Sequence, residues 1–241
     1  MILVFDKMTT PYFILISDSN KNVADVSNNQ IITLNNKIVH ILPYVNVDYY
    51  IKHGMFESNI IEWCKQLCSP YKNMLDIGAH SGTYALNLAD YSKSVYAFEP
   101  QRSTYYSLCG GVCLSGKQNI TCFQIGLGSS EQCGMKDLNI VSPDGGGSTL
   151  HPSSHVLRTE SIEIRTLDSF EFDNIGFIKI DVEENELFVL QGSVNTLQRS
   201  NFPKILFESN YENKELFDFV RNLNYKIVPL QGYRNMYIAE Q

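Results

Sequence analysis

A glycine-rich turn flanked by two acidic residues is the first candidate for ligand chemistry. The segment 75–84 (LDIGAHSGTY) leads from an apolar strand into a helix, and its Gly78-x-x-x-Gly82 spacing lets the backbone approach a ligand closely. The segment lacks the G-x-G-x-x-G spacing and the Lys-Ser/Thr pair of phosphate-binding loops. Glu99 follows Asp76 at close to the spacing of about 20 residues that places an acid at ribose hydroxyls. These features predict a nucleoside site without a diphosphate. The alternative is an ordinary strand-turn-helix with solvated acids.

A second group of charged residues shares one side of a later strand. In the segment 179–183 (KIDVE), charged and apolar positions alternate, so Lys179, Asp181 and Glu183 point the same way. Asp181 falls at the carboxyl end of this strand, the edge at which open α/β sheets bind ligands. A carboxylate there can take the proton of an attacking hydroxyl, or hold a divalent ion that acidifies the hydroxyl. The alternative is an internal ion pair between Lys179 and the carboxylates.

The next strand offers further ligands for such an ion. Glu208 and Asn210 end the strand that is expected beside the one carrying Asp181. All three side chains present oxygen atoms, which hard cations such as Mg²⁺ prefer. A magnesium-type site formed by Asp181, Glu208 and Asn210 is therefore a second hypothesis for this edge.

Alternating strand and helix patterns must position these groups. Strand-like runs are expected at 73–77, 94–98, 120–125, 176–182 and 204–208. Helical patterns are expected at 56–67, 83–90, 103–114, 186–197 and 214–223. This alternation predicts βαβ units and a parallel sheet.

Two stretches depart from that alternation. Residues 126–160 are polar, contain Asp144-Gly-Gly-Gly-Ser148 and are too long for an ordinary connection, so a substrate or lid loop is expected there. Runs at 225–230 and 236–239 are joined by only five residues, which permits only an antiparallel pair. A mostly parallel sheet closed by one reversed strand is typical of methyltransferases and differs from an ordinary dinucleotide-binding fold.

The first 45 residues form a separate pattern. Short β-rich runs at 12–16, 24–26, 30–34 and 37–42 alternate with polar turns, and Asn35-Asn36 is a hairpin signal. The sequence therefore predicts a small antiparallel β meander at 1–45, followed by the main domain at 46–241.

Composition limits the classes of partner. The chain has 241 residues, 44% of them hydrophobic and 19% charged, which predicts a globular protein of one large domain with a small appendage. The net charge is −7 and no basic run offsets it, so neither nucleic acid nor an anionic membrane is expected as a partner. The start lacks a signal-peptide pattern, and Cys64, Cys68, Cys109 and Cys113 are expected as buried thiols, which favours the cytoplasm. Homo-oligomerisation stays open.

These blocks resemble the FkbM family of S-adenosylmethionine-dependent O-methyltransferases. The resemblance covers about residues 50 to 241 and is carried by five motifs in family order: 76–84 (DIGAHSGTY), 98–100 (FEP), 166–168 (TLD), 179–183 (KIDVE) with Glu186, and 207–208 (FE). It implies a class I methyltransferase-like, Rossmann-type fold with a mostly parallel seven-stranded sheet. It also implies methyl transfer near Asp181 to a hydroxyl of a small molecule, of the sugar or glycan class.

The same resemblance implies the residues around S-adenosylmethionine. Glu99 would bind the ribose hydroxyls, and aromatic side chains at Tyr49, Phe56 and Tyr84 could wall the sulfonium. The remaining residues implied at the cofactor are Asp76, Gly78, His80, Gly82 and Thr83.

Two residues depart from the family pattern. The family usually has Asn at the position of His80 and Gly at the position of Glu184. A side chain at Glu184 bears on the tight turn after the strand and on the placing of Glu183 and Glu186. The missing glycine at 184 suggests one rival interpretation, a non-catalytic cofactor- or partner-binding module with this fold. A nicotinamide-dependent oxidoreductase is a second rival.

Overall fold

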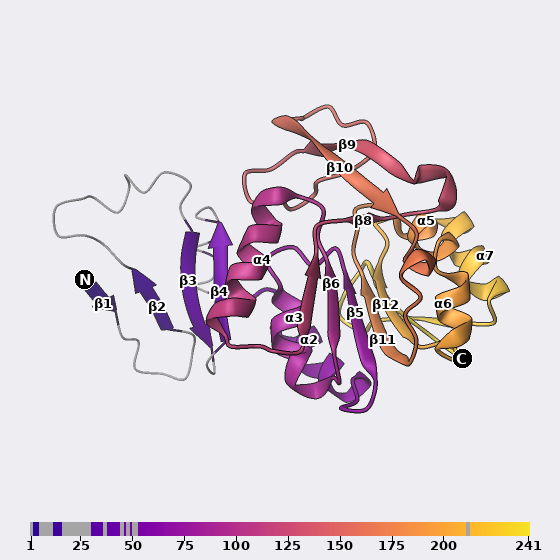
Figure 1. Cartoon of the computed structure of the whole chain (residues 1–241), viewed down its shortest axis with the longest axis horizontal. Helices are drawn as coiled ribbons and strands as arrows, with labels where there is room; N and C mark the ends of the chain where they lie inside the picture. Colours follow the sequence, from indigo (N-terminus) through magenta and orange to yellow (C-terminus); the bar gives the residue numbers. More distant parts are fainter. Residues whose placement is uncertain are drawn as a thin grey trace.

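A seven-stranded sheet lies at the centre of the protein, with helices on both faces (Figure 1). The structure is a computed structural model that describes residues 2–4, 12–15, 30–35, 38–43, 46, 49, 53–210 and 213–241. Neighbouring strands run parallel, except that β14 is antiparallel to both β12 and β13. The strand order is β13 (Lys226–Pro229), β14 (Met236–Glu240), β12 (Lys204–Glu208), β11 (Ile175–Ile180), β5 (Asn73–Ile77), β6 (Val95–Phe98) and β7 (Ile120–Phe123). The predicted mostly parallel sheet with a terminal antiparallel hairpin is confirmed.

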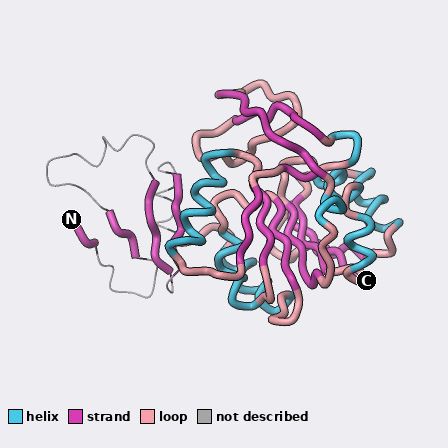
Figure 2. The backbone as a smooth tube through the Cα atoms, in the orientation of Figure 1, coloured by secondary structure: helices cyan, strands magenta, loops and turns pink. Residues whose placement is uncertain are grey.

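Both faces of the central sheet are buried because helices cover each of them (Figure 2). In β5, Met74 packs toward one helical layer, whereas Leu75 and Ile77 pack toward the other. The first layer contains α2 (Ser58–Cys64), α3 (Thr83–Leu88) and α4 (Arg102–Leu114), and the second contains α5 (Glu186–Gln191), α6 (Val194–Arg199) and α7 (Lys214–Asn222). Short 3-10 helices lie at Lys65–Leu67, Ala89–Tyr91, Ser130–Gln132 and Leu167–Phe170. This burial explains why the strands are near-continuous apolar runs.

The helix predicted at 186–197 is two helices. α5 ends at Gln191 and α6 begins at Val194. Between them, a Cβ on Gly192 would lie 2.1 Å from the carbonyl oxygen of Gly128. Only glycine permits this approach of the two backbones, and the helical path is interrupted at that point.

The stretch predicted as one long loop, 126–160, contains strands. β8 (Gly126–Leu127), β9 (Gly134–Ile140) and β10 (Arg158–Arg165) form a three-stranded sheet in the order β8-β10-β9, beside the end of the central sheet (Figure 1). The loop proper is therefore 141–157. Strands β9 and β10 contribute a small core of their own, formed by Leu138, Ile140, Ile162 and Ile164. This core stabilises the three-stranded sheet.

The N-terminal segment forms a four-stranded antiparallel sheet, in agreement with the predicted meander. Its strands are β1 (Ile2–Val4), β2 (Tyr12–Leu15), β3 (Gln30–Asn35) and β4 (Ile38–Pro43). The run expected at 24–26 lies outside the described residues, and β1 was not expected. The division at residue 45 stays a prediction.

Strand β4 lies against helix α4. A Cβ on Gly110 would lie 2.4 Å from Ile41 Cδ1, and one on Gly111 would lie 3.0 Å from the Val39 carbonyl oxygen. The Val39 amide donates to Ser115 Oγ at 2.7 Å, just past the end of α4. The two glycines within the helix thus let β4 come close enough to reach the cavity described below.

Two further expectations can be compared with the structure. In the part of the chain described, no helix is long and apolar enough to cross a membrane. The six cysteines are free thiols, and Cys64 is buried as expected. Cys113 is exposed, contrary to expectation, because α4 buries the side that carries Thr104, Leu108 and Gly111.

Candidate active site

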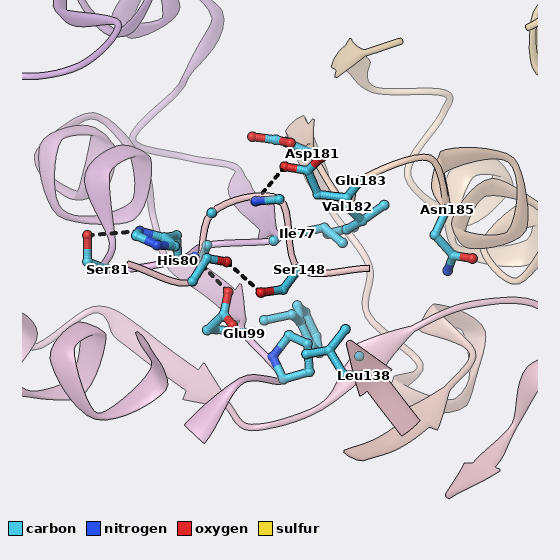
Figure 3. A pocket seen from close by; sticks show the side chains of 18 of the residues that line it. Ile77, His80, Ser81, Glu99, Leu138, Ser148, Asp181, Val182, Glu183 and Asn185 are labelled. Atoms are coloured by element: carbon cyan, nitrogen blue, oxygen red, sulfur yellow. Dashed lines mark hydrogen bonds between the residues drawn. The ribbon is translucent and has the colours of Figure 1, made fainter. Parts of the chain in front are cut away.

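A cavity of about 330 Å³ opens at the carboxyl edge of β6, β5 and β11 (Figure 3). This volume falls in the range of small-molecule sites, about 300–1,000 Å³. Its polar lining comes from the turn after β5, the ends of β6 and β11, and the loop after β9. Its apolar lining includes Leu138, Ile162 and Ile164 from the small sheet. The position is the one at which open α/β sheets bind ligands.

The turn after β5 adopts left-handed backbone conformations. Gly78 has φ of 75°, and a Cβ there would lie 1.8 Å from the Asp181 carbonyl oxygen, so glycine allows the ends of β5 and β11 to meet. His80 has φ of 50°, a region in which Asn and His are both enriched among non-glycine residues. That shared tolerance explains why histidine can stand where the family usually has asparagine.

Gly82 and Asp76 lie behind the cavity wall and do not line it. Gly82 precedes α3 with φ of 90°, and a Cβ there would lie 2.7 Å from Leu108 Cδ1. Asp76 is fully buried, and its Oδ2 accepts the Ala85 amide at 2.8 Å. Both residues, which were expected at the cofactor, thus contact α3 and its neighbours and not the cavity. By contrast Gly78, His80, Thr83, Tyr84 and Glu99 all line the cavity.

Glu99 lies at the end of β6 with its carboxylate held by three donors. Oε2 accepts the His80 amide at 2.8 Å. Oε1 accepts the Gln101 amide at 2.9 Å and the Thr104 hydroxyl at 2.8 Å. A carboxylate offers about four acceptor positions. Glu99 therefore keeps acceptor capacity toward the cavity beyond these three donors.

Lys179 is a buried ammonium between two carboxylates. Its Nζ donates to the Gly78 carbonyl at 2.7 Å, and it lies 3.4 Å from Asp181 Oδ2 and 3.8 Å from Asp76 Oδ1. Burial alone would lower the pKa of Lys179, but the neighbouring charges, chiefly Asp181, raise it above its usual value. Burial raises the pKa of Asp76, and the charge of Lys179 opposes that shift. The predicted ion pair is present, and it leaves the Asp181 side chain 33% exposed in the cavity.

The turn after β11 retains its tight geometry without glycine. Glu183 and Glu184 have φ of 53° and 73°. Non-glycine residues reach this region at an energetic cost, so the turn is strained at both positions. Glu183 lines the cavity, and Oε1 of its carboxylate accepts the Gly147 amide at 3.0 Å. Burial, followed by the charge of Asp181, raises the pKa of Glu183.

Aromatic side chains border the same end of the cavity. The Tyr84 hydroxyl donates to Glu57 Oε2 at 2.7 Å, and Lys179 Nζ lies 5.3 Å from the centre of the Tyr84 ring. Phe56 also lines the cavity. Tyr49 stacks on Phe56 with ring centres 4.0 Å apart and is not among the lining residues. Glu57 falls within the helical pattern predicted at 56–67 and was not expected at the cavity.

Residues 141–151, here called the strap, lie along the cavity and bond to both of its ends. At one end His80 Nε2 donates to the Asp144 carbonyl at 2.7 Å, and Asn46 Nδ2 donates to Asp144 Oδ2 at 3.1 Å. At the other, the strap reaches Glu183 through Gly147. Figure 3 shows Ser148 between these ends, close to Glu99. The glycine-rich loop singled out in the sequence thus forms part of the cavity wall.

The structure does not support the predicted magnesium site. Glu208 lies beside Asp181, because Ile180 pairs with Phe207 in the sheet. Asn210 lines a separate cavity of about 190 Å³, and its Oδ1 accepts a hydrogen bond from the side-chain Nδ2 of Asn235 at 2.9 Å. Within the described ranges, no group of three His, Cys, Asp or Glu side chains is arranged to hold a metal ion. Asn210 is drawn away from Asp181 because the chain turns toward the β13–β14 hairpin.

Two further carboxyl groups near Asp181 have raised pKa values. Burial and the charges of Asp181 and Glu183 raise the pKa of Glu208 to about 7. Burial also raises the pKa of Glu186 to about 7, although its Oε1 accepts the Val182 amide at 3.1 Å. Carboxyl groups are therefore clustered around Asp181.

Sequence reasoning missed the apolar wall. In β10, Ile162 and Ile164 face the cavity, whereas Glu163 between them is exposed. The alternation of residues 158–165 (RTESIEIR) has the period of two of a half-buried strand and could have predicted it. Gln101 and Asn46 carried no comparable signal, because their roles depend on contacts with the distant strap.

Comparison with known proteins identifies the family. The model of the "Methyltransferase FkbM domain" matches residues 76–234, which is more than half of the chain. The chain belongs to the FkbM methyltransferase family. Membership agrees with the resemblance seen in the sequence and implies S-adenosylmethionine as the methyl donor.

One curated protein and one solved structure are similar to this FkbM chain. Hexuronic acid methyltransferase AglP from Haloferax volcanii is 30% identical over 149 residues, which cover 58% of this chain and 58% of that protein. The crystal structure of an FkbM methyltransferase from Methylobacillus flagellatus aligns with a TM-score of 0.51 and 19% identity, covering 71% of this chain and 44% of that one. The chain thus spans about half the length of the relatives it matches. The structural likeness supports the shared fold.

The cavity fits a nucleoside cofactor of this kind. The lining combines the acceptor capacity of Glu99 with an apolar wall on the small sheet, and the turn after β5 has no phosphate-binding pattern. At the opposite end, the Asp181 side chain stays 33% exposed in the cavity, where a carboxylate can take a proton. Carboxylate acceptors and an apolar wall therefore line one and the same cavity.

Proposed function

We propose that this chain transfers a methyl group from S-adenosylmethionine to a hydroxyl of a sugar or glycan. The observation that carries the proposal is that Asp181 and Glu99 line one cavity, at the carboxyl edge of three adjacent strands. Family membership supports the donor, and the name of the Haloferax volcanii relative supports the sugar class.

At the cofactor end, the residues proposed to bind S-adenosylmethionine are Gly78, His80, Thr83, Tyr84 and Glu99. Glu99 accepts a ribose hydroxyl, because its carboxylate is already oriented by the amides of His80 and Gln101. The apolar wall of Leu138, Ile162 and Ile164 receives the base. Asp76 and Gly82 act indirectly by fixing the turn and α3. When bound, S-adenosylmethionine supplies an electrophilic methyl group.

At the acceptor end, Asp181 is the proposed general base. Its carboxylate takes the hydroxyl proton as the hydroxyl oxygen attacks the methyl carbon. Lys179 holds that carboxylate through the contact at 3.4 Å and is itself anchored on the Gly78 carbonyl. Glu183 holds the strap through Oε1, and we assign its second oxygen to a hydrogen bond from the acceptor. Orientation of the reacting groups supplies the larger share of the effect, about 7–11 kcal/mol.

The test is a methyl-transfer assay with the full chain. The protein is incubated with S-adenosylmethionine and a panel of methyl glycosides of hexoses, hexosamines and hexuronic acids, and S-adenosylhomocysteine and methylated sugar are measured by mass spectrometry. We expect both products in equal amounts with at least one sugar, and neither without the protein.

Two other results separate the rivals. Calorimetric binding of S-adenosylmethionine with no transfer to any sugar or other hydroxyl compound would favour a non-catalytic module. Tighter binding of NAD than of S-adenosylmethionine would favour an oxidoreductase. In both cases the proposed function is wrong.

A further inference from the structure

The acceptor end of the cavity has more carboxylates than its cations can balance. Asp181, Glu183 and Glu57 line it, and Glu208 lies beside Asp181 on the adjacent strand. These three lining carboxylates contact Lys179, the Gly147 amide and the Tyr84 hydroxyl, respectively. The site itself is defined by the cavity and by family membership, and the carboxylates determine its preference for charge.

The described lining contains a single ammonium, Lys179, and it is already engaged. Lys179 is 4% exposed and lies between Asp76 and Asp181. His80, the remaining basic side chain of this lining, donates from Nε2 to the Asp144 carbonyl at the other end of the cavity. No arginine lines the described cavity. An anionic acceptor would therefore find neither a free ammonium nor a guanidinium here.

We propose that the acceptor bears no negative charge beside its reactive hydroxyl, and that it binds best when a protonated amine lies there, as in a hexosamine. This inference rests on the proposed function and concerns the same site. A carboxylate placed among Asp181, Glu183 and Glu208 meets like charges without a compensating cation. An ammonium at the same place is attracted by them. Burial first, and then the like charge of Asp181, raises the pKa of both Glu183 and Glu208, and a cation here would relieve the second of these effects.

The charge of the cofactor does not remove this preference. S-adenosylmethionine carries a sulfonium, an ammonium and a carboxylate, hence one net positive charge. Four carboxylates stand at the acceptor end, namely those of Asp181, Glu183, Glu57 and Glu208. Lys179 is shared with Asp76, so negative charge remains after the cofactor is counted. In the charge of its preferred acceptor, this chain should thus differ from the hexuronic acid methyltransferase that it resembles over 58% of each sequence.

The experiment compares sugars that differ only in charge. Methyl glycosides of glucose, glucosamine and glucuronic acid, with the corresponding galactose and mannose sets, are offered with S-adenosylmethionine near pH 7 at low ionic strength, where the hexosamine amine is still largely protonated. Within each set that reacts, we expect kcat/KM for the hexuronate to be at least about tenfold below that for the hexose, with the hexosamine at or above the hexose. Added salt should narrow the difference because it screens charge. A hexuronate that reacts as well as the hexose overturns the inference.

Variants assign the preference to the acidic end. Glu208→Gln removes one charge there, and the variants are compared near pH 8, where the group is ionised because its pKa is about 7. We expect the hexose-to-hexuronate ratio to fall by about threefold. Glu163→Gln is the matched control, because Glu163 is exposed on β10 and points away from the cavity. Equal ratios in Glu208→Gln and Glu163→Gln would overturn the assignment.

Binding separates this inference from the proposed function. Saturation-transfer NMR with S-adenosylhomocysteine-loaded protein and the same sugars detects binding without turnover. Hexosamine bound more tightly than hexuronate, with no transfer to any sugar, supports the charge preference and contradicts the proposed function. Transfer with a hexuronate bound as tightly as a hexosamine, or bound more tightly, supports the function and overturns the charge preference. Equal or absent binding of all three also overturns it.

Discussion

The two ends of the cavity hold their carboxylates in opposite ways. At the cofactor end, three donors, one from the turn after β5 and two from the start of α4, converge on Glu99. At the acceptor end, Asp181 and its acidic neighbours share one buried ammonium. The first end is organised before any ligand arrives, whereas the second keeps negative charge for the ligand and the reaction to use. Binding and chemistry are therefore divided between residues that can be changed separately.

The largest effect is expected at Asp181. Asp181→Asn keeps the size of the side chain but abolishes its basicity, so we predict a loss of about 10²–10⁴ in kcat. Turnover is measured at saturating S-adenosylmethionine, with Glu163→Gln as the charge-matched control. Full activity in Asp181→Asn would reduce Asp181 to an ion-pair partner of Lys179.

The buried acid Glu186 should make stability depend on pH. Its pKa is raised from 4.5 to about 7 by burial, so the folded protein binds the proton more tightly than the unfolded chain does. The resulting stabilisation is complete below about pH 4.5 and is lost as pH rises through about 7. We predict a loss of about 2–3 kcal/mol over that range, at about 1.4 kcal/mol per pKa unit. Urea unfolding between about pH 5 and pH 8 measures it, and Glu186→Gln should flatten the profile. An unchanged slope in the variant would contradict the assignment.

A smaller effect is expected in the strap. Gly145 has φ of 84°, and a Cβ there would lie 2.7 Å from Gln101 Nε2. Gly145→Ala should therefore disturb the wall beside Glu99 and weaken S-adenosylhomocysteine binding by about 1–2 kcal/mol. Gly146→Ala is the matched control, because the nearest atom to its Cβ would be 3.6 Å away. Similar affinities for the two variants in calorimetry would mean that the strap does not shape the cofactor end.

The smallest effect concerns the strained turn after β11. Glu184→Gly should relieve the φ of 73° and stabilise the fold by about 0.5–1 kcal/mol relative to Glu184→Ala. Both variants remove the carboxylate, so their difference isolates the backbone contribution. Thermal unfolding compares them. If Glu184→Ala is the more stable of the two, the turn is not strained.

The sequence predicted what depends on local pattern. Apolar periodicity located the strands of the central sheet, and the short link between 225–230 and 236–239 required the antiparallel hairpin. The carboxyl-edge rule brought Glu99 and Asp181 to one cavity, because parallel strands end at the same edge.

The rest depended on contacts between distant segments. Gly82 resembled a ligand-binding glycine, yet it serves the packing of Leu108 against α3, which no local pattern reveals. Asn210 follows β12 as expected, but its bond to Asn235 depends on where the last hairpin lies. Residues 126–160 were taken as one loop because they are polar and long, and the pairing of β9 with β10 that organises them joins separate segments.

The most direct test of the divided cavity is calorimetric titration of S-adenosylhomocysteine into the parent protein, Glu99→Gln and Asp181→Asn, with methyl transfer measured on the same samples. Glu99→Gln keeps the shape of the side chain but removes its charge, so we predict binding weaker by about 1.5–3 kcal/mol. Asp181→Asn should bind nearly as tightly as the parent while losing turnover. The reverse pattern, with binding lost in Asp181→Asn and retained in Glu99→Gln, would contradict the account.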